Sequence, residues 1–370
     1  MLDRLDDIPW KRLTHAYGPA EDVPDLLRSL RTAPAETTGE QSPLWHLFGN
    51  IWHQGTVYEA TAYAVPFLIE LAAHSLVPDR LGILALLAAI ATGHSYRDVH
   101  GNMLNEPDFA ERKTVEIKWV EQAHAAVASG AAAFLAMTRE ETDVRLAAAH
   151  VLALLPEHRE VVGARLRSMV DKETGSLQRA GLLLLLGLAG DRSEAALSLL
   201  IGALSGDDLV QRRAAAVAFA YLKPDPLPDL ARAAILDAIA ADDLENSFDG
   251  LPWDAVADVM DRERLYACLD AASREEAAMV AIVAIESGNA TDQTVSTVLD
   301  LIFPLRPPRD KPPLTGPDLS PLQRRAVSAL ASAMAGGRRI FYGSFRLWGL
   351  PETSQGLRTL ASDDGPIPHR

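Results

Sequence analysis

Three stretches of the chain align without gaps: VRLAAAHVLALL at residues 144–155, QRAGLLLLLGLA at 178–189 and RRAAAVAFAYLK at 212–223. Their shared arginines, Arg145, Arg179 and Arg213, recur every 34 residues. A fixed period of this size, with one nearly all-apolar helix in each unit, is typical of helical hairpins that bury one face against the next hairpin. The sequence therefore predicts an α-solenoid.

The segments between and around these stretches also have a helical pattern. Residues 159–170, 192–204 and 227–241 carry apolar residues at i, i+3 and i+4, as a half-buried helix requires. Alternating apolar and polar runs, the pattern of a strand, are almost absent. We therefore predict an all-α fold, an α-α superhelix of stacked antiparallel helical hairpins. TVYE at residues 56–59 and SREE at 273–276 are predicted capping boxes at helix starts.

Two segments carry a family resemblance. The helix YEATAYAVPFLIELAAH at residues 58–74, with Pro66 inside it, and the segment TDVRLAAAHVLALL at residues 142–155 resemble HEAT repeats, including the bacterial variety of phycobilin lyase subunits. The resemblance covers roughly residues 58–334. HAYGPAEDVPDLL at residues 15–27, followed by NIWHQGTVYEATAYAVPFLIEL at residues 50–71, is similar to a group of bacterial HEAT-type proteins to which we attach no reaction. The resemblance implies a helical solenoid fold, and function must be argued from sites.

The predicted organisation follows from where the repeat pattern holds and where it is interrupted. We expect N-terminal cap helices at residues 1–57, HEAT-like repeats at 58–303 with a loop insertion at 93–108, a proline-rich loop at 304–319, and C-terminal cap helices and a tail at 320–370. Insertions in solenoids usually emerge on one face, and that face is often the binding one.

Composition narrows the possible locations and partners. The chain has 370 residues and a net charge of −15, so a nucleic-acid backbone or an anionic membrane is a poor partner. Its single cysteine, Cys268, cannot form an intramolecular disulfide. No apolar run reaches the roughly 18 residues that span a bilayer, and the N-terminus lacks a signal peptide. We expect a cytoplasmic protein with no membrane contact.

The most function-like region is an aromatic and histidine-rich patch within residues 41–63. Aromatic side chains with polar tips are enriched at recognition surfaces, but large rings also seal the open end of a solenoid, and the two roles can coexist. We expect the turn at His53 to lie near the loop that follows the next hairpin, forming a concave pocket. The candidate binding residues are Trp45, His53, Tyr58, His94 and His100.

The enzymes known to resemble this architecture either use a metal centre or act on DNA. Four histidines lie in or near the patch, but their spacing matches no metal motif. HEAT-type deoxyhypusine hydroxylases use His-Glu pairs, and this sequence has no His-Glu dipeptide. We expect no metal and no cofactor. HEAT-like alkylpurine DNA glycosylases hold DNA in a basic groove, whereas residues 1–300 carry 25 basic and 45 acidic residues. The repeated arginines are expected to tie one repeat to the next.

These observations favour a non-catalytic, protein-binding scaffold or inhibitor with a basic partner, because stacked hairpins provide a long surface without reactive groups. An immunity-type protein that neutralises a basic toxin is one version. The alternative is an enzyme, a glycosylase-like or metal-dependent activity that uses the N-terminal histidine and aromatic end. The catalytic residues, the partner's identity and the oligomeric state stay open.

Overall fold

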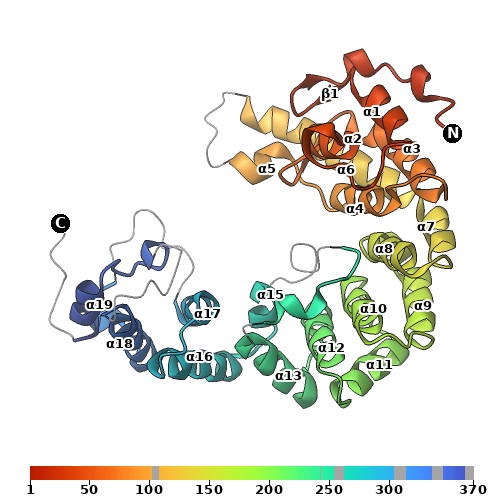
Figure 1. Ribbon diagram of the computed structural model, residues 1–370. Coiled ribbons are helices and arrows are strands. Elements are labelled where there is room, and N and C mark those ends of the chain that lie inside the picture. The colour runs from red at the N-terminus through yellow and green to blue at the C-terminus, as the bar shows by residue number, and fades with distance from the viewer. Residues whose placement is uncertain (102–107, 242, 254–261, 304–313, 336–344, 363–370) are drawn as a thin grey trace. The chain divides into compact units, whose positions relative to one another are not determined.

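The computed structural model describes residues 1–101, 108–241, 243–253, 262–303, 314–335 and 345–362 (Figure 1). Within these ranges the chain forms 18 α-helices, several 3-10 helices and two short β-hairpins, so the predicted all-α class is confirmed. Contacts divide the chain into two compact units. Unit 1 contains residues 1–199 and 250–254, and unit 2 contains residues 200–249 and 255–370.

The N-terminal part of unit 1 differs from the predicted set of cap helices. It contains the 3-10 helices η1 (Leu5–Asp7), η2 (Trp10–Arg12) and η3 (Gly39–Gln41), the helices α1 (Val23–Leu30) and α2 (Pro43–Asn50), and the strands β1 (Thr14–His15), β2 (Gly18–Pro19), β3 (Trp52–His53) and β4 (Thr56–Val57). Strands β1 and β2 pair antiparallel, as do β3 and β4.

The turn of the second hairpin explains why residues 56–59 do not cap a helix. Gln54 and Gly55 both have positive φ, +50° and +89°, which is the backbone of a two-residue type I′ turn. Thr56 therefore lies in β4, and the following helix begins at Thr61 with Ala60 at its N-cap. The predicted TVYE capping box is wrong for this reason.

The remaining helices of unit 1 form successive hairpins. They are α3 (Thr61–Ala73), α4 (Arg80–Ala91), α5 (Tyr96–His100), α6 (Phe109–Ala128), α7 (Ala131–Met137), α8 (Thr142–Ala153), α9 (Arg159–Val170), α10 (Ser176–Leu188) and α11 (Glu194–Leu204), which crosses into unit 2. Helix α3 packs on α4, α7 on α8 and α9 on α10, while α4 contacts α8 and α8 contacts α10. This packing is compatible with a helical solenoid.

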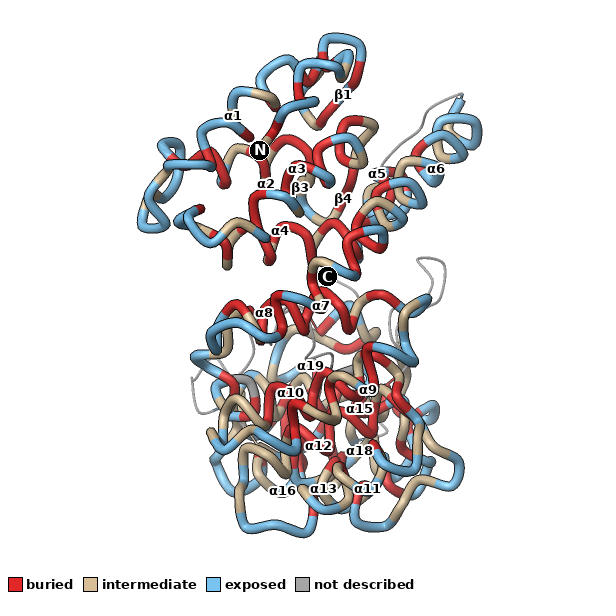
Figure 2. Tube along the Cα trace, turned by 90° about the vertical axis from the view of Figure 1, so that its right-hand side faces the viewer, coloured by how far each residue is buried: buried red, intermediate tan, exposed pale blue. Residues whose placement is uncertain are grey.

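Buried leucines hold these hairpins together. Leu152 and Leu184 are 1% and 0% exposed, as predicted, and the buried residues run along α8 and α10 in Figure 2. Gly181 lets another segment approach α10, because a Cβ there would lie 2.8 Å from the Leu251 side chain. The leucines at residues 182–186 are all buried, which explains why this helix is apolar on every side.

The repeated arginines act as ties inside each unit. In unit 1, Arg145 of α8 donates to the Glu173 carboxylate at 2.6 Å, beyond the end of α9. In unit 2, Arg213 donates to the Asp243 carboxylate at 2.7 Å, beyond the end of α13. Arg179 instead donates to a backbone carbonyl in the last turn of α9. The arginines thus lie at similar positions near helix starts and bind the end of a neighbouring helix or the residues beyond it.

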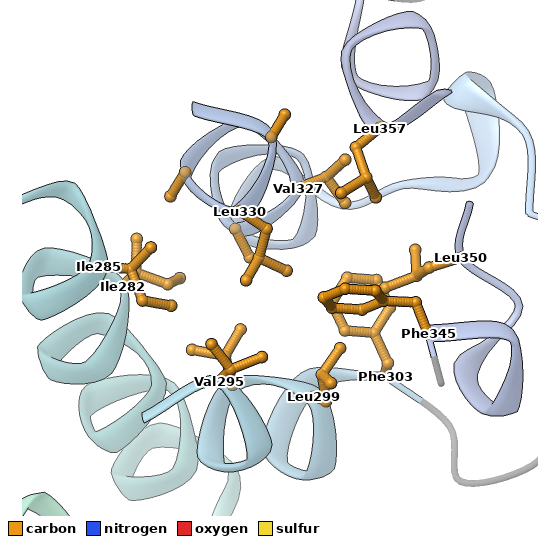
Figure 3. Packing of buried hydrophobic residues seen from close by; sticks show 14 of the residues in the cluster. Ile282, Ile285, Val295, Leu299, Phe303, Val327, Leu330, Phe345, Leu350 and Leu357 are labelled. Carbon is orange, nitrogen blue, oxygen red and sulfur yellow. The ribbon is translucent and has the colours of Figure 1, made fainter. Parts of the chain in front are cut away.

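Unit 2 has its own apolar core. It contains α12 (Leu209–Leu222), α13 (Asp229–Ala240), η6 (Glu245–Phe248), α15 (Arg262–Ala267), α16 (Ala271–Glu286), α17 (Asp292–Ile302), η7 (Gly316–Asp318), α18 (Pro321–Ala335), η8 (Phe345–Trp348) and α19 (Ser354–Ala361). Side chains of α16, α17 and α18 converge around Leu330, with Phe303 and Phe345 beside them (Figure 3). Phe219 of α12 is also fully buried, as predicted.

The start of α16 corrects the second predicted capping box. The helix begins at Ala271, and the carboxylate of Asp270 accepts the backbone N–H of Ser273 at 2.7 Å. An aspartate three residues upstream of the predicted cap thus satisfies the free amide of the first turn.

The predicted loop insertion at residues 93–108 is partly helical. Residues 93–108 contain helix α5, whose N-cap Ser95 accepts the backbone N–H of Asp98 at 3.1 Å. Arg97 of α5 forms a buried ion pair with Glu116 of α6, which anchors this segment. Residues 102–107, the proline-rich residues 304–313, and parts of the C-terminal region at 336–344 and 363–370 lie outside the described residues. Of the helices described, none has the length and apolar character to cross a membrane.

Candidate functional site

An open depression of about 560 Å³ lies in the N-terminal part of unit 1. It is bounded by the β1–β2 turn, helix α2 and the β3–β4 hairpin. His15 comes from β1, Tyr17 from the turn that follows it, and Asp22 from the N-cap of α1. The aromatic residues Trp45 and Phe48 come from α2, and Trp52 comes from β3. The site therefore combines aromatic surface with a carboxylate.

The aromatic rings are held at right angles to their neighbours. Phe48 and Trp52 make an edge-to-face contact with centroids 5.8 Å apart, and Tyr17 and His53 do the same at 5.5 Å. The Trp52 indole N–H donates to the Ala89 carbonyl at 3.1 Å, so its polar edge is satisfied inside the fold. Trp45 and Tyr17 are 51% and 70% exposed, an unusual degree of exposure for such large rings.

Asp22 organises the polar side of the depression. The Nε2–H of His15 donates to Asp22 Oδ1 at 3.0 Å, and the Asn50 amide donates to Oδ2 at 2.5 Å. His15 Nδ1 accepts the backbone N–H of Tyr17 at 3.0 Å, so Nε2 is the ring nitrogen that donates to Asp22. Both ring nitrogens of His15 are therefore engaged, and His15 holds the Asp22 carboxylate in place.

No lysine or arginine pairs with Asp22 in the described part of the chain. Its side chain is 49% exposed, and its one ion-pair contact is to His15. Asp22 occupies the N-cap position of α1 but makes no capping hydrogen bond. No lysine or arginine is among the residues that line the depression.

The structure separates the five candidate binding residues into two groups. Trp45 and His53 line the depression, whereas Tyr58, His94 and His100 do not. The depression therefore contains two of the five candidates. A role in binding for each of the five stays a prediction.

The expected proximity of the loop and the His53 turn is nevertheless present in the backbone. The His94 N–H donates to the Gly55 carbonyl at 2.8 Å, and the Val57 N–H donates to the His94 carbonyl at 3.0 Å. These bonds use the main chain of residue 94, and the His94 side chain is exposed. The His100 ring instead lies 4.5 Å from the Tyr96 ring, within α5.

Tyr58 has a structural role in the same region. Its hydroxyl accepts a hydrogen bond from Thr56 Oγ1 at 2.8 Å, and burial raises the pKa of the phenol. The Thr61 hydroxyl accepts the Tyr58 N–H at 2.9 Å and donates to the Ile51 carbonyl at 2.5 Å. Tyr58 therefore connects the hairpin to the first turn of α3.

Sequence reasoning missed three members of the site: His15, Tyr17 and Asp22. They belong to the stretch HAYGPAED, in which the Gly18–Pro19 pair is a turn signal next to an aromatic residue. Gly18 has a φ of +128°, a conformation that favours glycine. The histidine, tyrosine and acids of this stretch are binding-type residues, and they are the sequence signal that could have indicated this part of the site.

Other reactive groups are held in structural roles. Among the described residues, no three His, Cys, Asp or Glu side chains converge on a point that could hold a metal ion. Burial raises the pKa of the Cys268 thiol, which donates to the Leu265 carbonyl. His46 Nε2 lies 2.8 Å from the Glu40 carbonyl. Comparison with protein-family models, curated proteins and solved structures gives no match to the chain.

Proposed function

We propose that the chain is a non-catalytic, HEAT-like α-solenoid that binds a basic protein partner and acts as a scaffold or inhibitor. The solenoid part of this proposal is supported by the recurrence of Arg145, Arg179 and Arg213 and by the contacts of α4 with α8 and of α8 with α10. Stacked hairpins of this kind present a long surface on which a partner can be held.

The binding part of the proposal is carried by one observation, the depression that combines exposed aromatic rings with an uncompensated carboxylate. Trp45 and Tyr17 offer ring faces to solvent, and Asp22 supplies a negative charge beside them. Aromatic faces and carboxylates both attract cations, and aromatic residues are enriched in the energetic centres of protein interfaces. A basic segment of a protein satisfies both features.

Long-range electrostatics support a basic partner in the same way. The net charge of −15 creates a field that speeds the approach of a basic protein and opposes nucleic acid. An immunity-type inhibitor of a basic toxin is one form that the proposal takes.

The test compares partner capture by the full chain and two variants. Trp45→Ala removes an exposed ring of the depression, and Tyr63→Ala removes a 41% exposed ring of α3 outside it. We expect a basic protein from the source cells to bind the original chain and the Tyr63 variant, and to bind the Trp45 variant at least about tenfold more weakly. The affinity is also expected to fall as salt rises.

Two results would contradict the proposal. Equal capture by both variants would show that the depression is not part of the interface. Base release from alkylated DNA by the purified chain, or a stoichiometric bound metal with a metal-dependent activity, would favour the enzymatic alternative that uses the N-terminal histidine and aromatic end.

A further inference from the structure

Two hydrogen bonds fix the orientation of the Asp22 carboxylate. Each oxygen accepts one of them, from His15 at 3.0 Å and from Asn50 at 2.5 Å. A carboxylate oxygen has two lone pairs, and each oxygen of Asp22 therefore keeps the capacity to accept one more donor.

The surfaces around this carboxylate are flat rings. Trp45 and Tyr17 are exposed, and Phe48 and Trp52 complete the aromatic lining. A guanidinium is planar and weakly hydrated, stacks on aromatic faces and donates two parallel N–H groups to a carboxylate. A lysine ammonium is a compact, strongly hydrated charge that gains less from flat walls and from a pair of acceptors. The site therefore matches a guanidinium better than an ammonium.

From this match we infer that the depression is a receptor for one arginine side chain in a basic segment of the partner. The guanidinium pairs with Asp22 and lies against the exposed rings of Trp45 and Tyr17. This inference rests on the proposed function and specifies the chemistry of its partner.

The experiment measures binding of three short peptides to the full chain by ligand-observed NMR. The peptides are acetyl-Gly-Gly-X-Gly-Gly-amide with arginine, lysine or citrulline at X, since citrulline keeps the shape of arginine and lacks its charge. We expect saturable binding of the arginine peptide, at least about fivefold tighter than that of the lysine peptide, and no detectable binding of the citrulline peptide.

Variants of the chain locate the binding. Asp22→Asn and Trp45→Ala are each expected to weaken binding of the arginine peptide by about tenfold. The first removes a charge-assisted contact, and the second removes a ring face for a cation–π contact. Asp25→Asn is the matched control, because it removes the same charge one turn later in α1, where Asp25 already pairs with Arg28. Trp45→Ala keeps the test decisive if Asp22→Asn disturbs His15, because the exposed Trp45 ring makes no hydrogen bond to that network.

The outcomes separate this inference from the proposed function. Equal binding of the arginine and lysine peptides, or equal losses in the Asp22 and Asp25 variants, would overturn the arginine receptor. Partner capture could still depend on Trp45, and the proposed function would then stand without the inference. Conversely, selective arginine binding that Trp45→Ala abolishes would support the receptor even if no basic protein is captured.

Discussion

A buried histidine gives unit 1 a calculable sensitivity to acid. His150 of α8 is 2% exposed, and its ring is stacked on the Trp253 indole with centroids 5.1 Å apart. No described residue hydrogen-bonds to His150 Nε2. Burial lowers the pKa of His150 from 6.5 to about 4, because the charged imidazolium would lose its hydration. The native state therefore contains His150 in its neutral form.

The sign and size of the effect follow from these two pKa values. Below pH 6.5 the unfolded chain takes up a proton that the folded chain refuses until about pH 4, so stability falls as the pH is lowered through this window. At about 1.4 kcal/mol for each pH unit, the full loss is about 3 kcal/mol, and the loss between pH 7 and pH 5 is about 2 kcal/mol.

The assay is urea unfolding of the original chain and of His150→Phe at a series of pH values, followed by tryptophan fluorescence. Phenylalanine keeps a ring against Trp253 and cannot be protonated. Other titrating groups affect both chains alike, so the difference in unfolding free energy between them isolates His150. We expect that difference to change by about 2 kcal/mol from pH 7 to pH 5 in favour of the variant. Parallel pH profiles would refute the reasoning.

Three further predictions concern packing, ties and electrostatics. Leu184→Ala and Phe219→Ala should each lower the unfolding free energy by about 2 to 5 kcal/mol in urea titrations, and a loss below about 1 kcal/mol would place the residue outside the core. Arg80 is buried and donates to the Ala72 carbonyl at 2.6 Å and to both Glu140 oxygens. Arg80→Met should therefore lower the unfolding free energy by about 2 to 3 kcal/mol. Arg112→Met breaks the exposed pair with Asp108 and should lower the unfolding free energy far less than Arg80→Met, and equal losses would contradict a role for burial. Partner affinity measured between 50 and 300 mM salt should fall steadily, and a flat profile would argue against electrostatic association.

Helices α8, α10 and α12 could be predicted because their signal is periodic and local. An arginine followed by an apolar run recurs every 34 residues, and α8, α10 and α12 begin where that pattern begins. The two β-hairpins could not be predicted in this way, because strands of two residues are too short to show alternation. The helix starts at Thr61 and Ala271 were missed because other residues, Ala60 and Asp270, occupy the N-cap positions.

The candidate site was predictable only where its residues are neighbours in sequence. Trp45 and His53 lie on α2 and the adjoining β3, so the aromatic patch placed them together correctly. Asn50 donates a hydrogen bond to Asp22, from which it is separated by 28 positions in the sequence. This contact depends on how the N-terminal segments fold back on α2. His94 contributes its backbone to the hairpin, a role that no side-chain pattern indicates.

The central claim is that a basic partner contacts the aromatic depression. It is tested most directly by placing a photo-cross-linking amino acid at Trp45, and in a matched chain at Tyr63, and irradiating each in an extract of the source cells. Mass spectrometry then identifies the captured protein and the peptide joined to the chain. We predict one basic protein, captured from position 45 and not from position 63, through a segment that contains arginine. The same set of proteins from both positions, or an acidic protein from position 45, would contradict the claim.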